Sequence, residues 1–253
     1  MLRACLRTVR AFTRLRAGDA ASAQDNPSGT ALVRAERVEV GHLPAVGLLV
    51  GMAACVAFAV VSLMLPVVPL APFAAAIAST AVTVLLTGAL HERGLVDLVD
   101  SIDGSGAGAM PMLALLFAVG AKCALLAVLA AQSPGGVLAS LLAAHAVSRF
   151  APLPMASVIA PEAGRWPVPA LVARRSLWIA GLWCVPALLL LGVAGGGGSV
   201  AGALLFSGAA VAAWRHFLLR RHVQVRGGEG FGATQQVGEL AFYLGAAMAM
   251  QPQ

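Results

Sequence analysis

Long, nearly uninterrupted apolar runs dominate this chain and predict membrane-spanning helices. A helix needs about 20 mainly apolar residues to cross the hydrocarbon core of a bilayer, and most runs reach that length. The pattern therefore predicts an all-α fold, a polytopic transmembrane helical bundle of about six to seven spans. The predicted spans are residues 43–65, 67–90, 109–131, 134–160, 176–194, 199–219 and 232–250.

The run at 134–160 is the least regular of these segments. It contains His145, Arg149, Pro152 and Pro154, and proline inside a helix removes a backbone hydrogen bond. We expect a broken helix here. Irregular backbone at membrane depth persists only where protein or a water-filled cavity covers it.

The composition excludes a soluble globular protein. Of the 253 residues, 59% are hydrophobic and only 11% are charged, whereas soluble domains have about a quarter of their residues charged. The cysteines are scattered without metal-ligand spacing or a disulfide framework, and we give them no function beyond packing. They are Cys5, Cys55, Cys123 and Cys184.

The basic residues predict the orientation of the bundle. Outside the predicted spans, arginines lie within 3–37, at 93, at 165–175 and at 220–226, whereas the connections near 66, 131–136 and 194–199 carry no Lys or Arg. With seven spans, every basic segment falls on one side, which the positive-inside rule makes cytoplasmic. We expect a basic cytoplasmic segment at 1–41, one transmembrane domain at 42–253 and an external C-terminus. Topology and anionic lipid account for the net charge of +6 without a nucleic-acid partner.

An acidic cluster follows the second predicted span. Asp97, Asp100 and Asp103 recur every three residues, with His91 and Glu92 just upstream. On a helix this spacing gathers like charges on one side, where they repel. Mg²⁺ or Mn²⁺, which prefer oxygen ligands, would remove the repulsion. The alternative is a solvated helix end whose charges only stop translocation.

A glycine-rich segment precedes the last predicted span. Glycines 227, 228, 230 and 232 let a backbone approach a ligand closely, and the N-terminus of the helix after them would attract an anion. Gln235, Gln236 and Glu239 form a polar sector on that helix. An ionisable residue inside a membrane span is a functional candidate, although Glu239 could instead form a hydrogen bond between helices.

A third cluster lies in the irregular run. His145, Ser148 and Arg149 share one helical face. Arg149 must face protein or a water-filled cavity, where it would bind a phosphate or pair with Glu239. Lys122 stands alone in its span, and we interpret it as a snorkelling or paired structural lysine.

Four segments, in this order, resemble the cobalamin synthase family, the adenosylcobinamide-GDP ribazoletransferases of bacterial inner membranes. The resemblance implies a multi-pass inner-membrane transferase whose site faces the cytoplasm. It would join α-ribazole, or its 5′-phosphate, to adenosylcobinamide-GDP and release GMP, with Mg²⁺ as cofactor. The segments are HLPAVGLLVG (42–51), LLTGALHERGLVDLVD (85–100), AAHAVSRFAPL (143–153) and GGEGFGATQQVGELAFYLG (227–245).

The resemblance also implies roles for individual residues. The metal ligands would be Glu92, Asp97 and Asp100. The catalytic residues would be Asp97, Asp100, Glu229 and the phosphate contact Arg149, with Glu229 at a place where the family usually has Asp. Substrate binding would fall to His91, Gly228, Gly232, Gln235, Gln236 and Glu239.

Three departures from the family pattern keep other functions open. Arg93 stands where the family has an acid, residues 101–110 form a shortened loop without the usual Asp-Ser-Arg, and Gly227 replaces a Thr. The alternative is a catalytically impaired paralogue that binds or scaffolds corrinoid intermediates at the membrane. A transporter would require charges near the midplane, whereas most charges gather at one face. Self-association, and whether Asp103 replaces a missing site acid, are left open.

Overall fold

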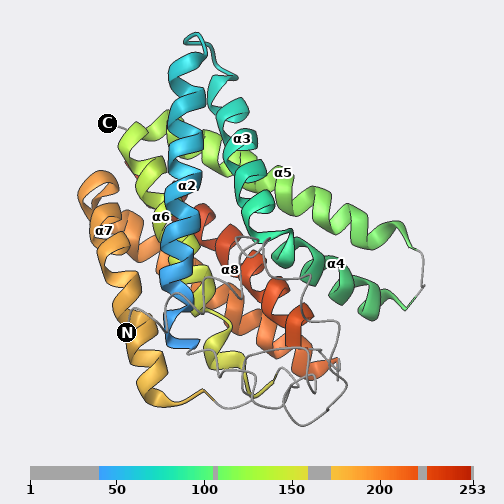
Figure 1. Ribbon diagram of the computed structural model, residues 1–253. Coiled ribbons are helices and arrows are strands. Elements are labelled where there is room, and N and C mark those ends of the chain that lie inside the picture. Colours follow the sequence, from blue (N-terminus) through green and yellow to red (C-terminus); the bar gives the residue numbers. More distant parts are fainter. Residues whose placement is uncertain (1–39, 105–107, 159–171, 222–226, 252–253) are drawn as a thin grey trace, which may run out of the picture.

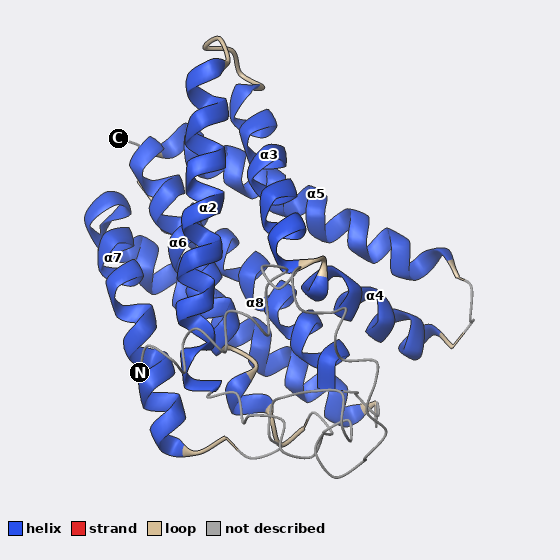
Figure 2. Ribbon diagram, in the orientation of Figure 1, coloured by secondary structure: helices blue, strands red, loops and turns tan. Residues whose placement is uncertain are grey.

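A computed structural model describes residues 40–104, 108–158, 172–221 and 227–251, and every regular element in these ranges is a helix (Figure 2). Within them, four helices are long and apolar enough to cross a membrane, and a bent helix pair would make a fifth. The chain is thus a multi-pass membrane protein, whereas the count of six to seven spans stays a prediction. Almost all of the predicted segment 1–41 lies outside the described residues, as do Arg165 and Arg226.

The first two helices form a hairpin that ends in a sharp bend. A short 3-10 turn (Val40–His42) leads into α2 (Leu43–Met64), and α3 (Ala71–Thr87) returns beside it. The predicted run 67–90 does not continue as one helix. Gly88 and Ala89 adopt left-handed backbone angles with φ of 67° and 58°, and α4 (Leu90–Asp103) leaves at 85° to α3. The acidic cluster therefore lies on a separate helix.

The middle of the chain forms α5 (Ala109–Gln132) and α6 (Pro134–Phe150). Ser133 starts α6 as its N-cap, since its hydroxyl oxygen accepts a hydrogen bond from the Gly136 amide at 3.0 Å. α6 is the most buried of the candidate spans. After Phe150 it gives way to a turn and a short 3-10 helix (Leu153–Met155), which confirms the predicted break in the proline-containing run.

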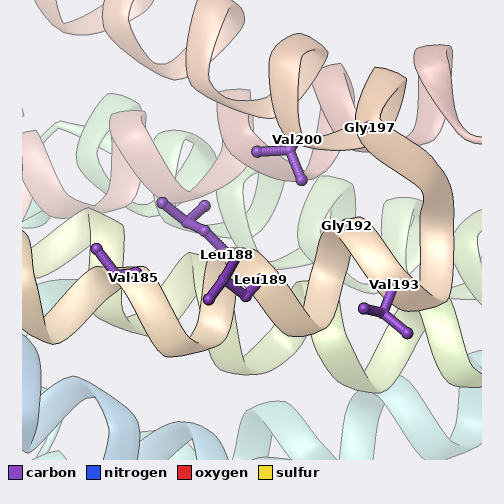
Figure 3. A pocket seen from close by; sticks show the side chains of 7 residues that line it. All are labelled: Val185, Leu188, Leu189, Gly192, Val193, Gly197 and Val200. Carbon is purple, nitrogen blue, oxygen red and sulfur yellow. The ribbon is translucent and has the colours of Figure 1, made fainter.

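The longest helical segment, α7 (Arg174–Arg220), consists of two arms that reverse at Gly196. The Gly196 φ and ψ of 81° and 161° fall in a region open almost only to glycine. The two arms of α7 match the predicted spans 176–194 and 199–219. Figure 3 shows Leu188 and Val200 on facing arms beside an apolar pocket. The last helix, α8 (Gly227–Ala249), packs mainly on α7 and α4.

The charge-free connections gather at one end of the bundle. The Gln132 side-chain amide donates to the Ala247 carbonyl at 2.9 Å, and the Ser133 hydroxyl donates to the Ala194 carbonyl at 3.3 Å. The end of α8 therefore lies at this end too, and the α2–α3 connection is at the top of Figure 1. The start of α7, with Arg174, lies at the opposite end. Most of the basic connections lie outside the described residues, so the predicted alternation and orientation stay a prediction.

Candidate functional site

The glycine-rich start of α8 crosses α4 at very close range. A Cβ placed on Gly94 would lie 2.9 Å from the Gly232 Cα and 3.0 Å from the carbonyl oxygens of Gly228 and Glu229. Such distances are too short for any side chain, so only glycine allows this crossing. Two segments that are far apart in the sequence, the acidic cluster and the glycine-rich segment, therefore meet.

The glycines themselves lie elsewhere than the sequence predicts. We expected a loop over 227–232 followed by a helix, whereas α8 begins at Gly227 and contains these glycines. Gly232 faces the α4 backbone, and a Cβ there would lie 3.0 Å from the His91 carbonyl oxygen. The close approach that these glycines permit is between two helices. Glu229 lies in the first turn of α8 and is half-buried.

A buried hydrogen bond joins the two signatures beside this crossing. The Gln236 side-chain amide donates to Oε1 of Glu92 at 3.0 Å. Glu92 is 9% exposed, and its Oε2 has no hydrogen-bond partner in the described parts of the chain. The Glu92 side chain therefore points toward α8 and the protein interior.

Arg149 brings the third cluster to the same place. Its Nη2 lies 3.3 Å from His91 Nε2, and its Nη1 donates to the His145 carbonyl at 2.9 Å. The guanidinium is buried, with Arg149 only 3% exposed. Among the ion pairs between described residues, none involves Arg149. A buried cation without a carboxylate partner favours a nearby anion.

Glu239 has a different partner from the one that the sequence left open. Its Oε1 lies 2.6 Å from Nζ of Lys122 and 3.6 Å from Nδ1 of His145, and it accepts a hydrogen bond from the Tyr243 hydroxyl at 3.1 Å. The alternative of a Glu239–Arg149 pair is therefore wrong. Lys122 is buried and paired, which confirms its interpretation as a paired structural lysine.

The remaining acids of α4 lie on its outer side. Asp97 and Asp103 are exposed and Asp100 is half-buried. Arg93 is also exposed, and helical spacing puts it one turn before Asp97 on the same side. Among the described residues, no three His, Cys, Asp or Glu side chains are grouped so that they could hold a metal ion.

These positions fit a magnesium ion only in part. Mg²⁺ is usually held by one or two carboxylates together with water and substrate phosphates. Asp97 and Asp100, three residues apart on an accessible helix face, suit that kind of site, whereas Glu92 faces α8. Two of the three predicted ligands, Asp97 and Asp100, are thus placed where they could bind Mg²⁺, and Glu92 is not.

Several buried polar atoms at this junction have no hydrogen-bond partner among the described residues. Buried polar groups are normally satisfied by protein, water or ligand. The predicted substrate-binding residue Gln235 is among them, through its Oε1, as are Thr234 Oγ1, His145 Nε2 and Glu92 Oε2. Each of α4, α6 and α8 therefore carries buried side-chain atoms with unused hydrogen-bonding capacity.

Sequence reasoning missed the two contacts that connect these helices, Lys122–Glu239 and His91–Arg149. A partial signal was present, because an ionisable residue within an apolar span needs a partner inside the protein. Lys122, Arg149 and Glu239 carry that signal. The sequence contains nothing that says which of them pair.

Known proteins resemble the chain over most of its length. The sequence model for cobalamin-5-phosphate synthase matches residues 4–247. A protein of Polaromonas sp. named adenosylcobinamide-GDP ribazoletransferase is 36% identical over 246 residues, which cover 85% of this chain and 86% of that protein. A protein of the same name from Albidiferax ferrireducens is 34% identical, and the match covers 85% of this chain and 88% of that protein. Another from Bradyrhizobium diazoefficiens is 31% identical, and the match covers 81% of each chain.

No solved structure significantly matches the chain. The family match nevertheless spans nearly all of the described helices, including α4, α6 and α8, which carry the three polar clusters. This chain belongs to the cobalamin-5-phosphate synthase family.

Proposed function

We propose that the chain is an adenosylcobinamide-GDP ribazoletransferase, as its relatives are named. The observation that carries the proposal is that residues from each of three polar segments meet where α4, α6 and α8 come together: His91 and Glu92 on α4, Arg149 on α6 and Gln236 on α8. The Glu92–Gln236 and His91–Arg149 contacts join them there. A site that binds two substrates and moves a phosphoryl group needs such a concentration of polar groups at one place.

The proposed reaction breaks a phosphoanhydride bond and forms a phosphate ester bond. A hydroxyl oxygen of α-ribazole, or of its 5′-phosphate, attacks the phosphorus atom that carries the corrinoid. The bond from that phosphorus to the oxygen of GMP breaks, GMP leaves, and the hydroxyl proton passes to a base. Catalysis of such a transfer is mainly positioning and stabilisation of phosphate charge.

The residues of the junction suit these tasks. Arg149 supplies a buried positive charge that would favour a phosphate beside α4, and such a charge acts strongly where water is excluded. Glu229, in the first turn of α8, is our candidate for the base. Asp97 and Asp100 are our candidates for holding Mg²⁺, which would neutralise charge on the phosphates when bound.

Purified protein in lipid nanodiscs tests the proposal directly. We expect GMP to appear from adenosylcobinamide-GDP and α-ribazole 5′-phosphate in equal amount to the corrinoid product. Substituting Asp97→Asn or Asp100→Asn should lower the rate about 100-fold or more. Asp103→Asn, on the same helix, tests the third acid: a comparable fall in rate would assign Asp103 to the site, and an unchanged rate would exclude it. Absence of GMP release from well-folded protein at ample Mg²⁺ would refute the proposal.

The metal assignment can be tested without the reaction. We expect the wild type to bind Mn²⁺ as a stand-in for Mg²⁺, observed by electron paramagnetic resonance in the presence of GDP. Asp97→Asn and Asp100→Asn should weaken that binding, whereas Glu92→Gln should leave it nearly unchanged, because Glu92 faces α8. Equal loss of binding in Glu92→Gln would return Glu92 to the ligand set.

Arg93 supports a second candidate, a catalytically impaired paralogue that binds corrinoid intermediates. Its exposed cation lies on the same side of α4 as Asp97 and would compete with a metal ion for the carboxylates. This candidate predicts saturable binding of adenosylcobinamide-GDP without GMP release. It further predicts that Arg93→Asp gains metal binding. Turnover by the unaltered chain would exclude it.

A further inference from the structure

An ion pair lies deep inside the bundle, away from the exposed acids of α4. Lys122 is in the middle of α5, a candidate membrane span, and its Nζ lies 2.6 Å from Glu239 Oε1 on α8. Both residues are only 4% exposed. A charged side chain in a span is expensive unless it is paired, so each residue accounts for the burial of the other.

The pair is the first link of a chain of contacts that ends on α4. Oε1 of Glu239 also lies 3.6 Å from His145 Nδ1 on α6. One turn later on α6, Arg149 donates to the His145 carbonyl and reaches His91 Nε2 on α4. Four helices, α5, α8, α6 and α4, are thereby connected through side chains.

The helix at the end of this chain depends on such contacts for its direction. α4 follows a break at Gly88 and Ala89 and lies at 85° to α3, so helix continuity does not orient it. Its position depends on packing against α8 and α5 and on the polar contacts of its first turn. Those contacts come from His91 to Arg149 and from Glu92 to Gln236.

We propose that Lys122 and Glu239 are positioning residues, whose mutual neutralisation keeps Arg149 beside His91. This inference rests on the proposed function for its catalytic consequence. Glu239 acts here as the counter-ion of Lys122, in place of the substrate contact that the family resemblance implies. Neither side chain needs to touch a substrate.

The physical reason is competition for the nearest cation. Arg149 lies within Coulombic range of Glu239, yet it is not paired with it, because Lys122 already neutralises the carboxylate. Without Lys122, an unpaired buried carboxylate would attract the Arg149 guanidinium strongly, since charges in a low-dielectric interior interact over several ångströms. Arg149 would then leave His91, and the first turn of α4 would lose its contact with α6.

A double-mutant cycle tests this mechanism through the rate of GMP release. Lys122→Met should lower kcat about 10- to 100-fold, the effect expected when a reacting group is misplaced by about 1 Å, with KM changed much less. Lys122→Met combined with Glu239→Gln should recover most of kcat, because the carboxylate that Lys122→Met leaves unpaired is then removed, while Glu92, the other carboxylate in Coulombic range of Arg149, is unchanged. Lys122→Arg should retain kcat. Arg220→Met, which removes an exposed cation on α7, is the matched control and should equal the wild type.

Hydrogen–deuterium exchange provides a readout that does not require activity. We expect faster exchange of the α4 amides in Lys122→Met and a return toward the wild-type rate in the double variant. A double variant as slow in turnover and as mobile in α4 as Lys122→Met would overturn the inference. So would Lys122→Met with wild-type kcat and exchange. If Lys122→Met does not fold, Lys122→Arg and the double variant take its place. Slower turnover or faster α4 exchange in either of these folded variants would overturn the inference.

Failure of this inference is distinguishable from failure of the proposed function. A wild type that releases no GMP would refute the transferase assignment, while the exchange experiment would still test the link from Lys122 to α4. An active wild type with an unaffected Lys122→Met would refute only the positioning role.

Discussion

Arg149 illustrates how much one buried residue contributes at this site. Its guanidinium is enclosed by protein and held by a backbone carbonyl and two imidazoles. Removing a charge from water is costly, and neutral partners offset that cost only in part. A phosphate at the α4–α8 junction would add negative charge next to the guanidinium, beyond the longer-range attraction of Glu239 and Glu92. We therefore expect substitution of Arg149 to have a large effect on the rate of GMP release.

Arg149→Lys should impair the enzyme although the charge is kept. A lysine ammonium cannot reach His91 and the His145 carbonyl in the fixed, planar geometry of a guanidinium. We expect kcat/KM for GMP release to fall about 100-fold or more. Arg174→Lys, at the exposed start of α7, is the matched control and should keep the wild-type value. A normal kcat/KM in Arg149→Lys would show that only the charge matters.

The sequence indicated some of this residue-level chemistry. Lys122, Arg149 and Glu239 stand out because charged residues are rare within apolar spans, and each was predicted to face protein. Their partners were not predictable, because 117 positions separate Lys122 from Glu239 and 58 separate His91 from Arg149. Which side chains meet depends on the relative rotation and depth of whole helices.

At the scale of elements, the crossing of α4 and α8 decides whether a site exists. The crossing occurs at Gly94 and Gly232, where backbone meets backbone. The sequence predicted a helix only after the glycines of α8 and left the acidic segment as a possible helix end, so the helical start of α8 and the whole of α4 were not predicted. The 85° bend before α4 was not predicted either. A glycine such as Gly88 can end a helix, but glycine is also frequent inside membrane-spanning helices, and the local sequence does not set the direction in which the chain continues.

Gly94→Ala tests the importance of this crossing. The added methyl group would meet backbone atoms of α8, which cannot move aside as a side-chain end can. We expect a loss of about 1–3 kcal/mol of stability, seen as a lower apparent melting temperature, and a fall in GMP release of about 10-fold or more.

Gly120→Ala on α5 is the matched control for that substitution. No atom lies within 4 Å of a Cβ placed there, so we expect unchanged activity and an equal or slightly higher melting temperature, because alanine favours the helix. If Gly94→Ala behaved like Gly120→Ala, the close contact of the two signatures would not be required for the reaction.

The whole molecule is arranged for a membrane. Large apolar side chains such as Phe117, Leu182 and Val193 are exposed, whereas charged groups such as Lys122 and Glu239 are buried inside. A surface of this kind suits contact with lipid tails. The charge-free connections lie together at one end. The two ends of α7 carry the basic residues Arg174 and Arg220.

Reporter fusions test the orientation that the charge pattern predicts. With seven spans and a cytoplasmic basic face, we expect alkaline phosphatase to be active when fused after Gln253. A green fluorescent protein fused after Arg221 should fluoresce, because that end would be cytoplasmic. Inactive phosphatase after Gln253, or a non-fluorescent fusion after Arg221, would contradict the predicted number of spans or their orientation.

The sequence by itself determined where most helices lie and which connections carry charge. Both properties are local, because hydropathy and helical period depend on neighbouring residues. It also marked the acidic, glycine-rich and arginine-containing segments as candidates for one site. Only the tertiary structure decided that the glycines serve a helix crossing, that Glu92 faces α8, and that Glu239 pairs with Lys122. These outcomes depend on how closely two backbones can approach and on the need to neutralise every buried charge, which no single segment can satisfy alone.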